Sequence, residues 1–208
     1  MIAAVLFAAA VALPKVDIVY PPHGTIYDRN CSNAAQADVD AAIKLRPELE
    51  AEWTREGPQY LNAAFEAVGK PFPYGEMQAY LTVCPSAGTM SAPLMVNVRQ
   101  YLAGAAHPAP AGDFSEKLFH ELMHHYVSSI GINTPLRKKY SAEPMIVQAH
   151  LHVIALEKLV LTKLGKTAEL KFLEQEYVTS PKDSYARAWQ IVNEEGYEKF
   201  IDELRAKR

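Results

Sequence analysis

The pattern of hydrophobic and polar residues predicts two helical blocks with strands between them. Residues 33–69 are helical in pieces, with a break or first-turn proline at Pro47 and an end at Gly69. Two runs rich in strand-forming residues follow, 76–85 and 92–102, and the turn-prone stretch PSAGTMS joins them. The pattern therefore predicts a small antiparallel pair or sheet after the first helical block.

From residue 113 onward the pattern is mostly helical. Asp113 and Glu116 form a D-x-x-E start that predicts a capping box, and this helix would run to about Ser128, before Gly131. A second helix is expected from Ser141, which would cap it, to Gly165; it is apolar around most of its circumference and should be buried. Shorter helices are expected at 167–178, 183–194 and 196–206. The fold class predicted is α+β, with a small mixed or antiparallel sheet and a predominantly helical C-terminal part.

The first residues have the pattern of a leader. An unbroken apolar run ends at Leu13, and Ala10-Val11-Ala12 is a small-x-small cleavage pattern, although no Lys or Arg precedes the run. We interpret residues 1–13 as a signal peptide and 14–208 as one domain, exported to a periplasmic or extracellular space. The alternative is a buried first strand or helix. Cys31 and Cys84 would suit export if they pair, but two buried thiols fit equally well.

Composition narrows the classes of partner. Of the 208 residues, 49% are hydrophobic and the net charge is -3, which is typical of a globular protein and leaves no basic surface for nucleic acid. The remaining apolar segments predict core rather than a stable membrane span.

The sequence His120-Glu121-Leu122-Met123-His124 is an HExxH motif inside the predicted helix at 113–128. Residues four apart lie on one helical face with Cβ atoms about 5–6 Å apart, so both imidazoles can reach one Zn²⁺ ion. Glu121 would project beside the metal, where it can take a proton from water and pass it to a leaving amine. The motif therefore predicts a zinc site for peptide-bond hydrolysis.

A third ligand is needed, and Glu143 follows His124 after 18 intervening residues. The arrangement HExxH-x18-E resembles the gluzincin metallopeptidases, in particular the zinc aminopeptidases, over about residues 113 to 160. The resemblance implies a zincin-like domain in which His120, His124 and Glu143 hold Zn²⁺. It also implies that Glu121 activates water and that the substrate is a peptide or protein.

Other third ligands compete with Glu143. The metzincin pattern would need a histidine where Ile130 stands. His150 lies on the same helical face as Glu143 but about 10.5 Å further along the axis, so both cannot bind one metal. His152 is a further alternative, and Glu143 itself could simply stabilise the start of a helix. Glu143 is favoured because its spacing matches the family.

Two further roles are expected. Tyr185, at the start of a predicted helix, is our candidate donor to the oxyanion that forms on the substrate carbonyl, although tyrosines at helix starts commonly just pack. The strand within 92–102 could bind substrate main chain along its edge. Alternatives to a peptidase are an inactive zincin-like domain that binds metal or a protein partner, and a helical binding domain whose histidines are structural.

Overall fold

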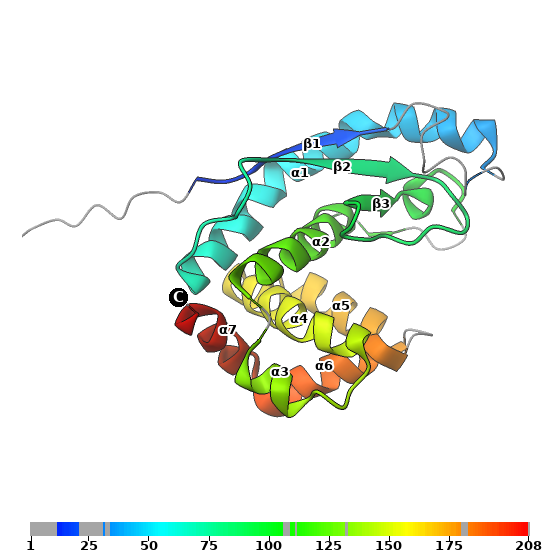
Figure 1. Ribbon diagram of the computed structural model, residues 1–208. Helices are drawn as coiled ribbons and strands as arrows, with labels where there is room; N and C mark the ends of the chain where they lie inside the picture. The colour runs from blue at the N-terminus through cyan, green and yellow to red at the C-terminus, as the bar shows by residue number, and fades with distance from the viewer. Residues whose placement is uncertain are drawn as a thin grey trace, which may run out of the picture.

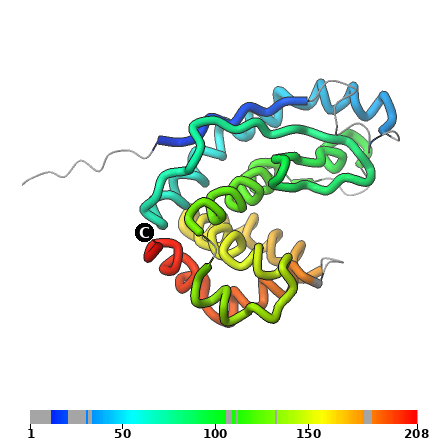
Figure 2. The backbone as a smooth tube through the Cα atoms, viewed as in Figure 1, coloured from blue at the N-terminus to red at the C-terminus, as the bar shows by residue number. Residues whose placement is uncertain are grey.

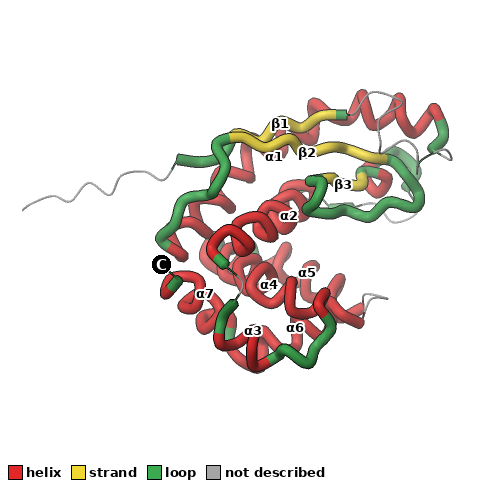
Figure 3. Tube along the Cα trace, viewed as in Figure 1, coloured by secondary structure: helices red, strands yellow, loops and turns green. Residues whose placement is uncertain are grey.

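A computed structural model describes residues 12–20, 31, 34–105, 109–110, 112–131, 133–179 and 183–207. The strands are β1 (Lys15–Val19), β2 (Glu76–Thr82) and β3 (Met95–Asn97), and the helices are α1 (Gln36–Val68), α2 (Asp113–Ile130), α3 (Pro135–Lys139), α4 (Met145–Lys163), α5 (Thr167–Thr179), α6 (Asp183–Glu195) and α7 (Tyr197–Ala206). Most of the predicted signal peptide, residues 1–11, lies outside the described residues. The described part is mixed α/β and mostly helical, which confirms the α+β class at a coarse level (Figure 3).

The sheet is parallel throughout, so the antiparallel pairing predicted for its strands is wrong. Its order is β1-β2-β3, with Ile18 opposite Ala79 and Leu81 opposite Val96. Helix α1 connects β1 to β2, as parallel neighbours require a crossover. The connection from β2 to β3 turns back on itself instead, and leaves only an antiparallel bridge between Met90 and Met95. The turn-prone stretch after β2 does reverse the chain direction. A second reversal before β3 then makes β3 run parallel to β2.

Helix α1 runs without a break through 33 residues, including Pro47 and Pro58. The break expected near Pro47 is therefore wrong. One face of the helix is buried against the rest of the domain, including Trp53, and the indole covers Gly57 so closely that an added Cβ would lie 2.6 Å from it. The burial of this face outweighs the loss of backbone hydrogen bonds at the prolines.

Helix α2 lies between two layers of the molecule (Figure 1; Figure 2). The sheet and α1 are on one side of it, and α4 with α5, α6 and α7 on the other; α2 contacts both α1 and α4. Its first helical residue is Asp113, after a Gly112 N-cap that offers no side chain, so the predicted capping box does not form. The Asp113 carboxylate instead accepts hydrogen bonds from Tyr101 and Gln100, at 2.5 and 2.9 Å.

Helix α4 is the buried central helix, as its apolar circumference predicts. Its buried residues include Val147, Leu151 and Val160. By length and hydropathy α4 could cross a membrane, but 61% of its most apolar stretch is buried inside the domain, as in a core helix. It begins at Met145 rather than near Ser141, and the unpredicted α3 precedes it. The reason is Pro144, because a residue before proline is disfavoured in helical conformation, and that residue is Glu143.

Candidate metal centre

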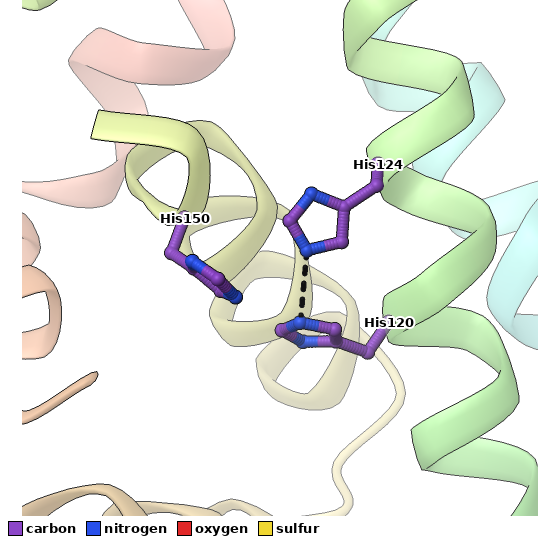
Figure 4. Close-up of side chains that lie close together, drawn as sticks. All are labelled: His120, His124 and His150. Carbon is purple, nitrogen blue, oxygen red and sulfur yellow. Dashed lines mark hydrogen bonds between the residues drawn. The ribbon is translucent and has the colours of Figure 1, made fainter. Parts of the chain in front are cut away.

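Three histidine side chains converge between α2 and α4 (Figure 4). His120 and His124 lie one turn apart on α2, and their Nε2 atoms are 3.2 Å apart. His150 points toward them from α4, and one ring nitrogen of each of the three residues lies within 4.8 Å of the others. Among the described residues, these histidines are the only group of three or more potential ligands that meets this criterion. They lie close enough together to bind one metal ion.

Hydrogen bonds fix which ring nitrogen faces the centre. The Nδ1 atom of His120 contacts Glu157 Oε1 at 2.6 Å, and Nδ1 of His150 contacts the backbone carbonyl oxygen of Ile146 at 2.6 Å. Because these oxygens accept hydrogen bonds, Nδ1 carries the proton in both rings, and each Nε2 keeps its lone pair for the centre. The outer partners therefore hold two of the rings in the tautomer and orientation that a metal requires.

The rings on α2 are held neutral. Burial lowers the pKa of His120 to about 3, helped by the nearby positive charge of Lys117. Burial also lowers the pKa of His124 to about 2, with smaller contributions from the neighbouring imidazoles. The contact between His120 and Glu157 is thus a hydrogen bond from a neutral ring rather than an ion pair. Neutral imidazoles are the form that binds metals.

Glu157 is a residue beside the histidine group that sequence reasoning missed. Its side chain is completely buried, and Oε2 accepts a hydrogen bond from the Tyr177 hydroxyl at 2.8 Å. Burial and the adjacent negative charge of Glu157 hold the pKa of Glu116 well above its ordinary value. A signal was present in the sequence: Glu157 lies seven residues after His150, two turns along the same face of α4.

A cavity of about 320 Å³ opens beside the histidines. Its lining comes from α2, α5, α6 and the connection between β2 and β3: Gly88, Thr89, Glu116, Lys117, His120, Glu121, Leu173, Glu176, Tyr177 and Tyr185. Glu121, predicted as the general base, is buried and lines this cavity directly after the first histidine. The motif glutamate and the His120 imidazole therefore face a common space large enough for part of a substrate.

Tyr185, predicted as an oxyanion donor, also lines the cavity. It reaches the site from α6, and its ring centroid is 4.4 Å from that of His150. Burial, together with the negative charges of Glu121 and Glu157, raises the pKa of Tyr185 to about 12. The hydroxyl therefore keeps its proton near neutral pH and can serve as a hydrogen-bond donor.

Glu143, the favoured third ligand from the sequence, lies outside the histidine group. Its carboxylate accepts two hydrogen bonds from Arg187, at 2.9 and 2.6 Å. The chain turns at Glu143 before α4 begins, so Glu143 is not on the ligand-bearing face of that helix. His150, the alternative weighed against it, occupies the third position instead.

The strand expected to bind substrate main chain has its outer edge covered. Met95 exchanges two backbone hydrogen bonds with Met90, at 2.9 and 2.8 Å, and the Asn97 N–H donates to Thr89 Oγ1. The outermost segment is therefore around Thr89, which itself lines the cavity. An open edge along β3 is not available for pairing.

Comparisons with protein-family models, with curated proteins and with solved structures found no match for this chain. The site must therefore be interpreted from its own donors. Three imidazoles suit Zn²⁺ and its neighbours among the transition metals, whereas Mg²⁺ and Ca²⁺ take oxygen ligands. The donor set thus fits a zinc ion with a fourth position left for water or substrate.

Proposed function

We propose that the protein is a zinc-dependent peptidase whose metal is held by His120, His124 and His150. The observation that carries this proposal is the convergence of the three imidazoles beside a cavity that His120 and Glu121 line. Catalytic zinc sites use three protein ligands and keep one position open, and three histidines form one of the known sets. The domain is then zincin-like in architecture, with histidine in the third ligand position.

The chemistry divides between the metal and the protein. When bound, zinc would supply Lewis acidity, which makes water a nucleophile near neutral pH and polarises the substrate carbonyl. Glu121 takes the proton from the attacking water and passes it to the leaving amine. The Tyr185 hydroxyl donates a hydrogen bond to the oxyanion that develops on the carbonyl. Glu157 keeps His120 in the required tautomer.

The substrate we assign to this cavity is a peptide or a protein segment. The lining combines apolar surface from Leu173 and Tyr177 with the ion pair between Lys117 and Glu176, at 3.2 Å. Such a mixture suits an amide-containing chain better than a purely apolar ligand. With residues 1–13 as a signal peptide, the peptidase would act after export.

The test compares two variants of the zinc-loaded protein. We expect Glu121→Gln to retain zinc and lose hydrolysis of a quenched fluorescent peptide library by about 10²–10⁴-fold, since it cannot accept the proton. Tyr185→Phe should also retain zinc and lose about 10²-fold in kcat, because one oxyanion donor is removed. Metal content by mass spectrometry separates a chemical defect from loss of the ion.

Two outcomes would favour the other classes of protein. A wild type that binds stoichiometric zinc and hydrolyses no peptide in the library supports an inactive zincin-like domain that binds metal or a protein partner. A wild type that binds no zinc at all supports a helical binding domain in which the histidines are structural. Hydrolysis that survives Glu121→Gln unchanged contradicts the role of this residue as the base.

A further inference from the structure

One buried tyrosine of α5, Tyr177, contacts the carboxylate that supports the histidine group. Its hydroxyl donates a hydrogen bond to Glu157 Oε2 at 2.8 Å and lies 3.2 Å from His120 Nδ1. The Nδ1–H of His120 donates to the other oxygen of the same carboxylate, Oε1, at 2.6 Å. Both oxygens of Glu157 are therefore held, and the carboxylate that orients the His120 ring cannot rotate without breaking a hydrogen bond.

The ring of Tyr177 contacts a second part of the site. It stacks on the ring of Tyr185, with centroids 5.5 Å apart and planes inclined by 22°. Tyr185 comes from α6 and is only half-buried, and its ring centroid is 4.4 Å from that of His150. Tyr177 is buried, and its ring also contacts Trp189, one turn further along α6, at 5.7 Å. The buried ring therefore restricts the rotamers open to the more exposed Tyr185.

Tyr177 can act on the metal site only through other residues. Its hydroxyl lies on the Nδ1 side of the His120 ring, whereas Nε2 of that ring faces His124 within the histidine group (Figure 4). A tyrosine that only filled the core could be replaced by phenylalanine without a change in metal binding. The hydrogen bond to Glu157 predicts instead that this replacement lowers the affinity for the metal.

We propose that Tyr177 is a positioning residue that couples the two halves of the site. Its hydroxyl fixes Glu157, and through Glu157 the His120 ring, in the orientation that metal binding requires. Its ring holds Tyr185 in place beside the cavity. The part that concerns His120 requires only that the histidines bind a metal, whereas the catalytic role of Tyr185 rests on the proposed peptidase function.

The first experiment measures zinc affinity in Tyr177→Phe by competition with a chelator. This variant keeps the ring and removes the hydroxyl, and we expect about 10-fold lower affinity than in the wild type, because Glu157 then orients His120 less firmly. The visible spectrum of the Co²⁺-substituted protein should also change, since it reports ligand geometry. Tyr126→Phe is the matched control: it removes a buried hydroxyl that donates to the Lys70 carbonyl oxygen at 2.7 Å, and it should bind zinc like the wild type. Wild-type affinity and an unchanged Co²⁺ spectrum in Tyr177→Phe would overturn the role of the hydroxyl.

The second experiment follows the position of Tyr185 without relying on activity. In the zinc-loaded protein we expect nuclear Overhauser contacts between the Tyr185 and His150 rings, with the Tyr185 signals identified by their absence in Tyr185→Phe. Tyr177→Phe, which keeps the stacked ring, should retain these contacts, and Tyr177→Leu should weaken them. Contacts of equal strength in the two variants would overturn the role of the ring.

The kinetic readout separates this inference from the function on which it partly rests. In zinc-saturated enzyme, Tyr177→Leu should lower kcat by about 10-fold with little change in KM, and should cause no further loss when combined with Tyr185→Phe. Additive losses from the two substitutions would contradict the coupling between the two tyrosines. A wild type that hydrolyses no peptide, together with weakened zinc binding in Tyr177→Phe, would contradict the peptidase and support the action of Tyr177 on His120.

Discussion

Helix α4 carries two histidines two residues apart: His150 belongs to the histidine group, whereas His152 contacts a glutamate of its own. On one face, His150 joins the histidine group in which His120 binds Glu157 at 2.6 Å. On the other, His152 binds Glu203 of α7 at 2.9 Å. Two residues along a helix correspond to about 200° of rotation, so the two contacts lie on opposite sides of α4.

The difference lies in where the second ring nitrogen points. His120 uses Nδ1 for Glu157, and its Nε2 faces His124. His152 uses the same nitrogen, Nε2, for both Glu203 and the Thr134 hydroxyl, and its ring packs edge-on against Phe200. In the part of the chain that the structure describes, no group of three ligands forms around His152. A buried histidine and glutamate pair therefore indicates a metal site only when the remaining nitrogen faces further ligands.

The largest expected effect is on zinc affinity. It is tested by one substitution at each of the two histidines of α4. His150→Gln should lower zinc affinity by more than about 100-fold, because it removes a ligand, a larger loss than an outer partner causes. His152→Gln keeps a polar side chain opposite Glu203 and should bind zinc like the wild type. Competition with a chromophoric chelator measures both affinities.

Equal zinc affinity in the two variants would contradict the assignment of His150. In that case the metal would have to be held without α4. Circular dichroism of both metal-free variants serves as the control for folding, since both histidines are buried residues of α4.

The next largest effect is also on zinc affinity, compared between substitutions of Glu157 and Glu203. Glu157→Gln should lower zinc affinity by about 10–100-fold, because an amide orients His120 less strongly than a carboxylate does. Glu203→Gln, on the opposite face of α4, should leave zinc affinity unchanged. The same chelator competition measures both, and loss of affinity in Glu203→Gln alone would reverse our assignment of the two faces.

A smaller effect is expected in the pH dependence of stability at Glu203. Burial raises the pKa of Glu203, but hydrogen bonds from His152 and from the Leu136 N–H outweigh burial and lower the pKa below its ordinary value of 4.5. A carboxyl group with a lowered pKa in the folded state stabilises the fold above its unfolded pKa, and this contribution is lost as the pH falls. Because Glu203 is only partly buried, Glu203→Gln should lower the free energy of unfolding by about 0.5–1.5 kcal/mol at pH 7 and by less at pH 3.

Urea denaturation of metal-free wild type and variant at several pH values measures this difference. Glu203→Asp, which retains the charge, is the matched control and should retain part of the pH dependence. A wild type and Glu203→Gln with parallel stability curves from pH 7 to pH 3 would show that the charge of Glu203 contributes nothing to the fold.

The helical part of the fold could be predicted from sequence because its signals are local. Helices at 167–178 and 183–194 match α5 and α6 within one residue, and the buried character of α4 followed from its apolar circumference. The parallel order of the sheet could not be predicted in the same way. Strand direction depends on how residues 83–94 fold back against Met95, which is a contact between segments rather than a property of either segment.

Part of the site was also local. Spacing of four residues on one helix placed His120 and His124 together, and adjacency placed Glu121 beside them. The third histidine of the group depends on the packing of α4 against α2, which the distance along the sequence alone does not determine. The dipeptide Glu143-Pro144 contained the needed information, since it excludes Glu143 from the helix that begins at Met145.

The smallest expected effect concerns Glu143. Its spacing in the sequence matches that of a metal ligand, but its position in space does not. Because its carboxylate binds Arg187 on a partly exposed surface, Glu143→Gln should lower the free energy of unfolding by at most about 1 kcal/mol. Zinc affinity should stay within about twofold of the wild type, which corresponds to about 0.4 kcal/mol of binding free energy. Arg187→Gln, the partner variant, should give a similar small loss of stability and the same unchanged affinity. A drop in zinc affinity in Glu143→Gln, without one in Arg187→Gln, would mean that the carboxylate moves to the metal when the ion binds, in place of His150.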